Sequence, residues 1–268
     1  MTCGISRQAG LSMSPCARKE RAQEKREQVL AWLLIETWSV FSVLQQLLRL
    51  SYATTHALMK GMEREGLTRS RALFVPAGNG VRRMILHGLT PHGAAVVQQA
   101  DARKSVSAWE PSKVSPSHVM HQILTQEAHL RALKNGWTQW RPTRALTDLG
   151  LAKLPDADAL SPDGHRVAIE VERFLKTPKR YEAILGAYIF EMKNGHWDRV
   201  DYLCPDAGFA MRLASAFGRL ERLRLERPKQ ITRSAAVEPA HLERFRFYVQ
   251  DDWPEGTYKS VKNSGVDK

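Results

Sequence analysis

The sequence predicts an α/β fold, α+β overall, in which helices and a hairpin precede a mixed sheet flanked by helices. Apolar residues recur at helical spacing over residues 29–65, strand and helix patterns alternate beyond residue 118, and a stretch rich in Ser, Pro and Lys separates the two halves. The expected organisation is a basic flexible arm at 1–27, an N-terminal domain at 28–104, a linker at 105–117, an α/β domain at 118–253 and a flexible tail at 254–268.

The charge balance predicts a polyanionic partner. The 268 residues contain 43% hydrophobic and 25% charged residues, which is typical of a globular protein. Lys and Arg number 40 against 28 Asp and Glu, a formal charge of +12. Residues 1–104 carry 15 basic and 7 acidic residues, and the remainder carries 25 and 21, so the basic excess is concentrated in the first half.

The cysteines and the apolar segments indicate a cytoplasmic protein without membrane insertion. Cys3, Cys16 and Cys204 lack the C-x-x-C spacing, which predicts neither a disulfide framework nor a cysteine zinc site. The first 26 residues contain no apolar run of the length that a secretory signal needs. The most apolar stretch, residues 28–50, is interrupted by Glu36 and Arg49, so it does not predict a membrane span.

The first half predicts three helices and a hairpin. After a helix around residues 29–38, Ser39 is a candidate N-cap for a helix at 40–48, and Ser51 caps a helix at 52–65. The turn between the last two helices is only two or three residues long, which is helix-turn-helix spacing. Strand patterns then follow at 67–75 and 81–86 around a turn at 76–80, and Thr90 starts a final helix.

This order resembles a winged-helix DNA-binding domain of the MarR-like regulators, over residues 27–100. In such a domain basic side chains on the hairpin neutralise phosphates, while the third helix approaches base edges. The DNA contacts predicted here are Thr54, Thr55, His56, Lys60, Arg64, Arg69, Arg71, Arg82 and Arg83. The alternative is a solvated hairpin face with helices that bind a protein partner, and residues 94–99 are a candidate homodimer surface.

The second half contains a hairpin with unusual acidic residues. A helix at 118–133 precedes a strand at 153–160, a turn at 161–164 and a strand at 166–172. Alternation sends Glu170 and Glu172 to one face, which Asp156 reaches if the hairpin closes. Three carboxylates predict a site for Mg²⁺ or Mn²⁺, which can activate a water against a phosphodiester. The structural alternative pairs the two glutamates with Arg166, Arg173 or Arg180.

Further elements complete a mixed sheet flanked by helices. The patterns predict a helix at 179–192, a strand at 198–203, a long arginine-rich helix at 209–225 and a strand at 244–249.

Pro155-Asp156 followed by Glu170-x-Glu172 resembles the PD-(D/E)xK nuclease core. Glu172 stands at the usual lysine position, so the resemblance implies that a catalytic cation comes from Lys176, Lys179 or Arg173. Glu127 on the preceding helix corresponds to the additional metal-binding acid of many members. The resemblance implies metal-dependent endonuclease activity.

Both halves together resemble the replication-relaxation and MobC-type plasmid mobilisation family. The resemblance rests on the winged helix followed by His and Glu, Pro-Asp, Glu-x-Glu-Arg and the Lys-Arg-Tyr helix. It places the family's histidine on His121 or His118, and it implies a partner duplex at a plasmid transfer origin together with other relaxosome or conjugation proteins. A relaxase that nicks one strand, by water or by a tyrosine such as Tyr181 or Tyr188, is one hypothesis. A non-enzymatic relaxosome accessory protein or a transcriptional regulator is the other.

Overall fold

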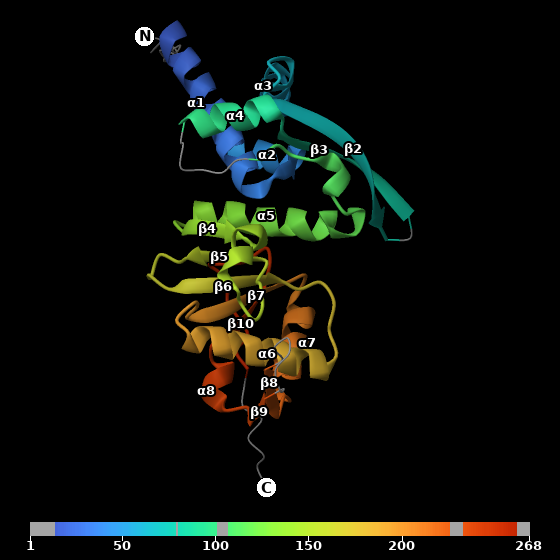
Figure 1. Ribbon diagram of the computed structural model, residues 1–268, viewed down its shortest axis with the longest axis vertical. Helices are drawn as coiled ribbons and strands as arrows, with labels where there is room; N and C mark the ends of the chain where they lie inside the picture. Colours follow the sequence, from blue (N-terminus) through green and yellow to red (C-terminus); the bar gives the residue numbers. More distant parts are fainter. Residues whose placement is uncertain (1–13, 79, 101–106, 226–232, 262–268) are drawn as a thin grey trace, which may run out of the picture. The chain divides into compact units, whose positions relative to one another are not determined.

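The computed structural model describes residues 14–78, 80–100, 107–225 and 233–261 (Figure 1). The predicted combination of helices with mixed sheets is confirmed. The chain divides into two compact units, Met1–Ala72 with Ile85–Pro111, and Leu73–Met84 with Ser112–Lys268. Each is described by itself.

Unit 1 is built on helices and a three-stranded sheet. Its elements are α1 (Pro15–Glu36), β1 (Trp38–Val40), α2 (Phe41–Leu48), α3 (Tyr52–Arg64), β2 (Thr68–Ala77), β3 (Gly80–Leu89) and α4 (Pro91–Ala100), and the tip of the β2–β3 hairpin is grouped with unit 2. The sheet order is β1-β3-β2, and β1 is antiparallel to β3.

Helix caps explain where the unit 1 helices begin. The Ser51 hydroxyl accepts a hydrogen bond from Thr54 N at 3.2 Å, so the predicted cap of α3 is confirmed. Ser39 is not a cap, because it is buried in β1 and pairs with His87 of β3. Residues 15–27, expected to be a flexible arm, form the first half of α1, with Ser14 as its N-cap.

The segment expected to be a linker contains a core residue. Trp109 is 1% exposed, and its backbone N–H donates to Leu89 O at 2.9 Å. A Cβ atom at position 88 would lie only 2.4 Å from the indole ring of Trp109, so glycine at this position leaves the space that the ring fills. Trp109 therefore packs in unit 1, while residues 105 and 106 of the predicted linker lie outside the described residues. The homodimer surface expected on α4 stays a prediction.

Unit 2 contains a five-stranded mixed sheet. After α5 (Val119–Lys134) its strands and helices are β4 (Thr138–Pro142), β5 (Ala157–Leu160), β6 (Arg166–Val171), α6 (Pro178–Lys193), β7 (Arg199–Cys204), α7 (Ala207–Gly218), β8 (Arg222–Leu225), β9 (Arg233–Ala236), α8 (Pro239–Leu242) and β10 (Phe245–Val249). The order is β10-β7-β6-β5-β4, with β4, β5 and β6 antiparallel in turn and β6, β7 and β10 parallel.

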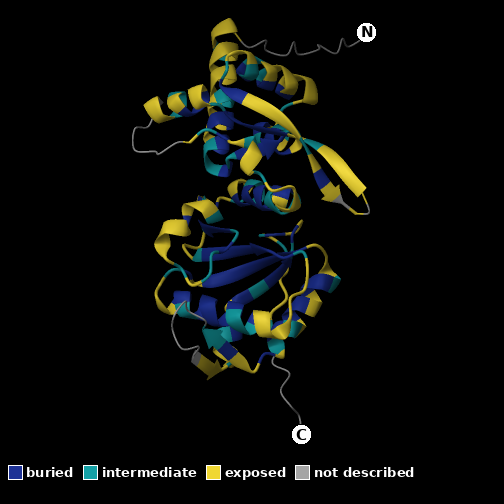
Figure 2. Ribbon diagram, turned by 45° about the vertical axis from the view of Figure 1, so that its right-hand side comes forward, coloured by how far each residue is buried: buried dark blue, intermediate teal, exposed yellow. Residues whose placement is uncertain are grey.

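Helices cover the two faces of this sheet (Figures 1 and 2). Its central strands β5, β6 and β7 are almost entirely buried, whereas the edge strand β4 begins with two exposed residues. Helix α5 lies on one face, while α6 and α7 lie on the other and share a core with Ala168, Val200 and Tyr202. The long helix expected at 209–225 is wrong: α7 ends at Gly218, and residues 222–225 form β8, which pairs with β9. The predicted tail is ordered in part, because Lys259 bridges to Phe247.

Candidate functional site

The β5–β6 register places two of the predicted acids opposite each other in unit 2. Ala157 pairs with Ile169, so Asp156, which directly precedes β5, lies across from Glu170. Asp156 Oδ2 accepts a hydrogen bond from Val171 N at 2.8 Å, which holds the aspartate against the end of β6. The hairpin forms because the turn at Ser161 closes, with Gly164 N donating to Ser161 O at 2.9 Å.

Basic side chains of the same chain contact both carboxylates. Asp156 Oδ1 lies 2.9 Å from Nε2 of His121 on α5. The Glu170 carboxylate, whose residue is 8% exposed, forms an ion pair with Lys153 and accepts a hydrogen bond from the Tyr188 hydroxyl of α6. We call Lys153, Asp156, Glu170, His121 and Tyr188 the acidic-pair cluster.

The cluster shifts the pKa values of its members. The hydrogen bond to Asp156 raises the pKa of His121 above its usual range, although burial opposes this. Burial raises the pKa of Glu170, the charge of Asp156 adds to the rise, and Lys153 opposes it. Burial also raises the pKa of Tyr188 far above its ordinary value. A tyrosine in this state is a hydrogen-bond donor to Glu170 rather than a ready nucleophile.

Glu172 pairs with a lysine outside the cluster. Strand β6 ends at Val171, and the carboxylate of Glu172 forms an ion pair with Lys176, four residues later in the chain. The hydroxyl of Tyr181 accepts a hydrogen bond from Lys176 N at 3.0 Å, and burial raises the Tyr181 pKa to about 12. Lys176 is therefore held by Glu172, away from the pair formed by Asp156 and Glu170.

Glu127 lies in a different environment, although it shares α5 with His121. Burial raises its pKa, and the charged groups that act on it are Arg131 and Asp251. Six residues separate His121 from Glu127, which on a helix turns their side chains to different faces. His118 stands at the start of α5, as its N-cap residue, and its side chain makes no capping bond.

The predicted three-carboxylate metal site is not formed. Among the residues that the structure describes, no three His, Cys, Asp or Glu side chains are grouped so that they could hold a metal ion. Asp156 and Glu170 lie together, but Glu172 is paired elsewhere and Lys153 already neutralises Glu170. The residues present do not fit Mg²⁺ or Mn²⁺ in this arrangement, because such an ion needs several free oxygen ligands.

Sequence reasoning missed Lys153, which balances Glu170. The signal available in the sequence was the run Lys153-Leu-Pro-Asp156, which places a lysine three residues before the aspartate. In the structure this run brings Lys153 to the end of β6, where its ammonium also donates to Leu154 O at 2.9 Å. The glutamates pair with two lysines rather than with Arg166, Arg173 or Arg180.

The predicted DNA contacts occupy α3 and the β2–β3 hairpin. Exposed side chains on α3 are Thr54, His56, Lys60 and Arg64. Thr55 differs from them: it is 0% exposed, so its side chain cannot contact DNA from this position. Lys60 forms an ion pair with Glu63 at 2.9 Å, and the ring of His56 stacks on that of Tyr52.

The hairpin carries exposed arginines without carboxylate partners. Arg71, Arg82 and Arg83 are exposed, and within the described ranges no Asp or Glu forms an ion pair with any of them. Arg69 is different, because its guanidinium donates to the carbonyl of Trp109 and lies over that indole ring. Three of the four predicted hairpin cations are thus available to an external anion.

Comparisons with known proteins identify no family for this chain. No protein family matches the sequence, and no curated protein matches it. A solved structure of Lactococcus lactis ZitR, the C30AH42A mutant in apo form, matches at 22% identity over 34% of this chain and 73% of that chain, with a TM-score of 0.24. A likeness at this level supports no statement about function. The chain is a two-unit α/β protein, and none of its described helices has the length and apolar character that crossing a bilayer requires.

Proposed function

We propose that the chain binds duplex DNA through α3 and the β2–β3 hairpin, which together with α2 have the arrangement of a winged helix-turn-helix. The observation that carries this proposal is the group of exposed hairpin arginines without carboxylate partners, Arg71, Arg82 and Arg83. Three residues separate α2 from α3, and Arg49 turns the chain there with φ 51°. Such a short turn sets the second helix against a groove while the hairpin flanks it.

Helix α3 and the β2–β3 hairpin have different roles in the proposed binding. Thr54, His56 and Arg64 present small and polar groups on the exposed face of α3, which suits contacts with base edges. Arginines on the hairpin neutralise phosphates, and this contact is independent of sequence. Sequence-specific binding therefore depends on α3. Most of the salt dependence of DNA binding comes from the hairpin.

Replacing Arg82 and Arg83 by glutamine is expected to weaken binding to every duplex by about tenfold or more. It should reduce the slope of log K against log salt by up to about 2, because each phosphate contact contributes about 0.9. Fluorescence anisotropy with a duplex of about 30 base pairs at several salt concentrations measures both quantities.

The control removes two cations from α1, by Lys19→Gln and Lys25→Gln. Equal losses in both double variants would mean that only net charge matters. An unchanged slope in the hairpin variant would exclude the hairpin from the interface.

In the proposed function unit 2 acts without cleaving DNA. Its sheet order and the position of Asp156 opposite Glu170 are similar to the PD-(D/E)xK arrangement, but Lys153 forms an ion pair with Glu170, and Nε2 of His121 lies 2.9 Å from Asp156 Oδ1. The resemblance to plasmid mobilisation proteins then favours an accessory protein of the relaxosome, which binds a transfer origin.

Strand nicking is a second candidate, favoured by the position of Asp156 opposite Glu170 at the ends of adjacent strands. The test compares nicking of a supercoiled plasmid by the wild type, Asp156→Ala and Glu170→Ala in the presence of Mg²⁺ or Mn²⁺. We expect no nicking by the wild type. Nicking that both variants lose, and that the exposed control Asp163→Ala keeps, would establish cleavage instead.

A further inference from the structure

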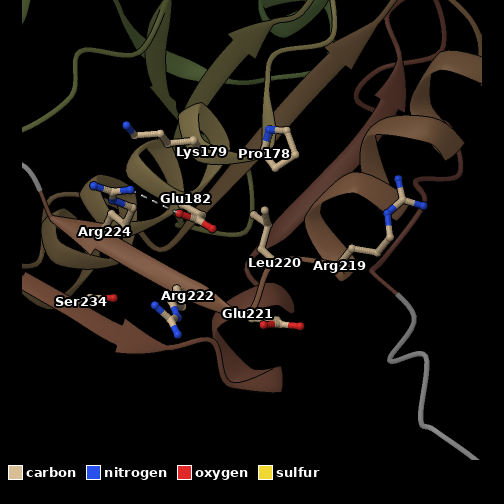
Figure 3. A pocket seen from close by; sticks show the side chains of 9 residues that line it. All are labelled: Pro178, Lys179, Glu182, Arg219, Leu220, Glu221, Arg222, Arg224 and Ser234. Carbon is tan, nitrogen blue, oxygen red and sulfur yellow. Dashed lines mark ion pairs between the residues drawn. The ribbon is translucent and has the colours of Figure 1, made fainter.

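Unit 2 contains a cavity of about 710 Å³ at the start of α6, and none of its lining residues belongs to the acidic-pair cluster (Figure 3). Side chains from α6, from the end of α7 and from β8 and β9 line it. Its charged lining consists of Lys179, Glu182, Arg219, Glu221, Arg222 and Arg224. Among the described residues, no aromatic side chain lines it.

The lining has more positive than negative charge. Four cations face two carboxylates, and one of the carboxylates, Glu182, lies 4.0 Å from Nη1 of Arg224 (Figure 3). In the described part of the chain no ion pair engages Lys179, Arg219 or Arg222, all of which are exposed. The excess of positive charge along one hollow repels further cations and attracts an anion, so an anion bound there offsets the repulsion between the lining side chains.

Backbone packing fixes the position of the arginines. Gly186 of α6 allows β8 to approach closely, because a Cβ at this position would lie 2.4 Å from Arg224 O. Strand β8 is held on its other side by β9, with Arg222 opposite Ala236 and Arg224 opposite Ser234. On α6, the Thr177 hydroxyl accepts from Arg180 N at 3.4 Å and fixes the first turn, which carries Lys179.

The chemistry of the lining selects a phosphate group. Guanidinium groups bind phosphate oxygens in a fork, and a lysine adds a mobile point charge. A nucleobase needs apolar or aromatic walls, and the apolar side chains among the described lining residues are Pro178 and Leu220 alone. The exposure of Lys179, Arg219 and Arg222 leaves room for a polymer to continue beyond the cavity.

We propose that this cavity, the basic pocket, binds a backbone phosphate of a DNA strand. The inference rests on the proposed function and adds a contact in unit 2 to those of α3 and the hairpin. Its role is to hold DNA that extends beyond the recognised site, without reading the bases.

The test compares wild-type protein with the double variant Arg219→Gln, Arg222→Gln in binding a duplex of about 30 base pairs at several salt concentrations. Removing one phosphate contact is expected to lower the salt slope by about 1 and to weaken binding about three- to tenfold at moderate salt. The charge-matched control, Lys134→Gln with Arg212→Gln, removes two exposed cations outside the pocket and should change the slope less. Circular dichroism checks that both variants are folded.

The outcomes separate this inference from the proposed function. If the wild type binds DNA and the pocket variant has an unchanged slope, the inference fails and the proposed function stands. If the wild type does not bind DNA, both fail. A second arm titrates inorganic phosphate alone and follows the thermal midpoint. If phosphate raises the midpoint of the wild type but not of the pocket variant, while DNA binding is equal in both, the pocket binds a free phosphate and the DNA assignment is overturned.

Discussion

Replacement of Lys153 by methionine is expected to lower the free energy of unfolding of unit 2 by about 3–5 kcal/mol at about pH 8. The substitution leaves the Glu170 carboxylate, in a residue only 8% exposed, beside Asp156 and without its cation. Tyr188 still donates a hydrogen bond, but one neutral donor does not offset an uncompensated buried charge. Amide hydrogen exchange of β5 and β6 in increasing urea measures the loss within unit 2 itself.

The loss should depend on pH in a direction that follows from the raised pKa of Glu170. A carboxyl group that binds its proton more tightly in the folded state stabilises the fold at low pH, and this contribution is lost as pH rises from the unfolded value of 4.5 through the folded value. Removing Lys153 raises the folded pKa further, because the main opposing cation is gone. The variant should therefore approach wild-type stability below pH 4.5 and fall behind it as pH increases.

The double variant Lys153→Met, Glu170→Gln provides the matched control. A neutral amide at position 170 removes the buried charge, so most of the lost stability should return and the added pH dependence should disappear. A loss of the same size at low and high pH, or no recovery in the double variant, would show that Lys153 stabilises the fold by packing alone.

Asp158 is a second buried acid on the same sheet. Its replacement by alanine is expected to lower the free energy of unfolding of unit 2 by about 3–5 kcal/mol. Asp158 is 0% exposed and accepts from Arg141 Nε at 2.8 Å and Nη2 at 2.5 Å. Its Oδ2 also accepts from the indole N–H of Trp197 at 3.1 Å. The alanine leaves a buried donor unsatisfied and an arginine without its partner.

Asp163→Ala is the control for this prediction, because Asp163 also lies near an arginine but is exposed. Its side chain is 59% exposed, and Oδ2 lies 3.6 Å from Nη1 of Arg199. Its removal should cost less than about 1 kcal/mol. Equal losses for Asp158→Ala and Asp163→Ala, measured by the same exchange experiment, would show that burial does not determine how much these ion pairs contribute to the free energy of unfolding.

Sequence patterns predicted most of the helices and strands that are determined by residues close to one another in the chain. Ser51 has the side chain that an N-cap needs, and alternation along residues 166–172 identified β6. The pattern failed where a distant segment decided the outcome. Residues 222–225 have helical neighbours in sequence but form β8, since β9 supplies the strand that pairs with them. Trp109 lies in a Ser- and Pro-rich stretch, yet it fills a space that Gly88 leaves.

The sequence by itself determined the basic excess of the first half, the arginines on the hairpin and the face of the strand that carries Glu170, because composition and strand alternation depend on neighbours along the chain. The position of Asp156 opposite Glu170 depends on the β5–β6 register, which the folded hairpin sets. Only the tertiary structure decided which cation each acid meets. Alternation assigns a side chain to a face, but Lys153 and Tyr188 reach Glu170 from a loop and from α6. The same packing pairs Glu170 with Lys153 and places Asp156 beside His121 at the expected metal site. It also brings the cations that line the basic pocket together from α6, the C-cap of α7 and β8.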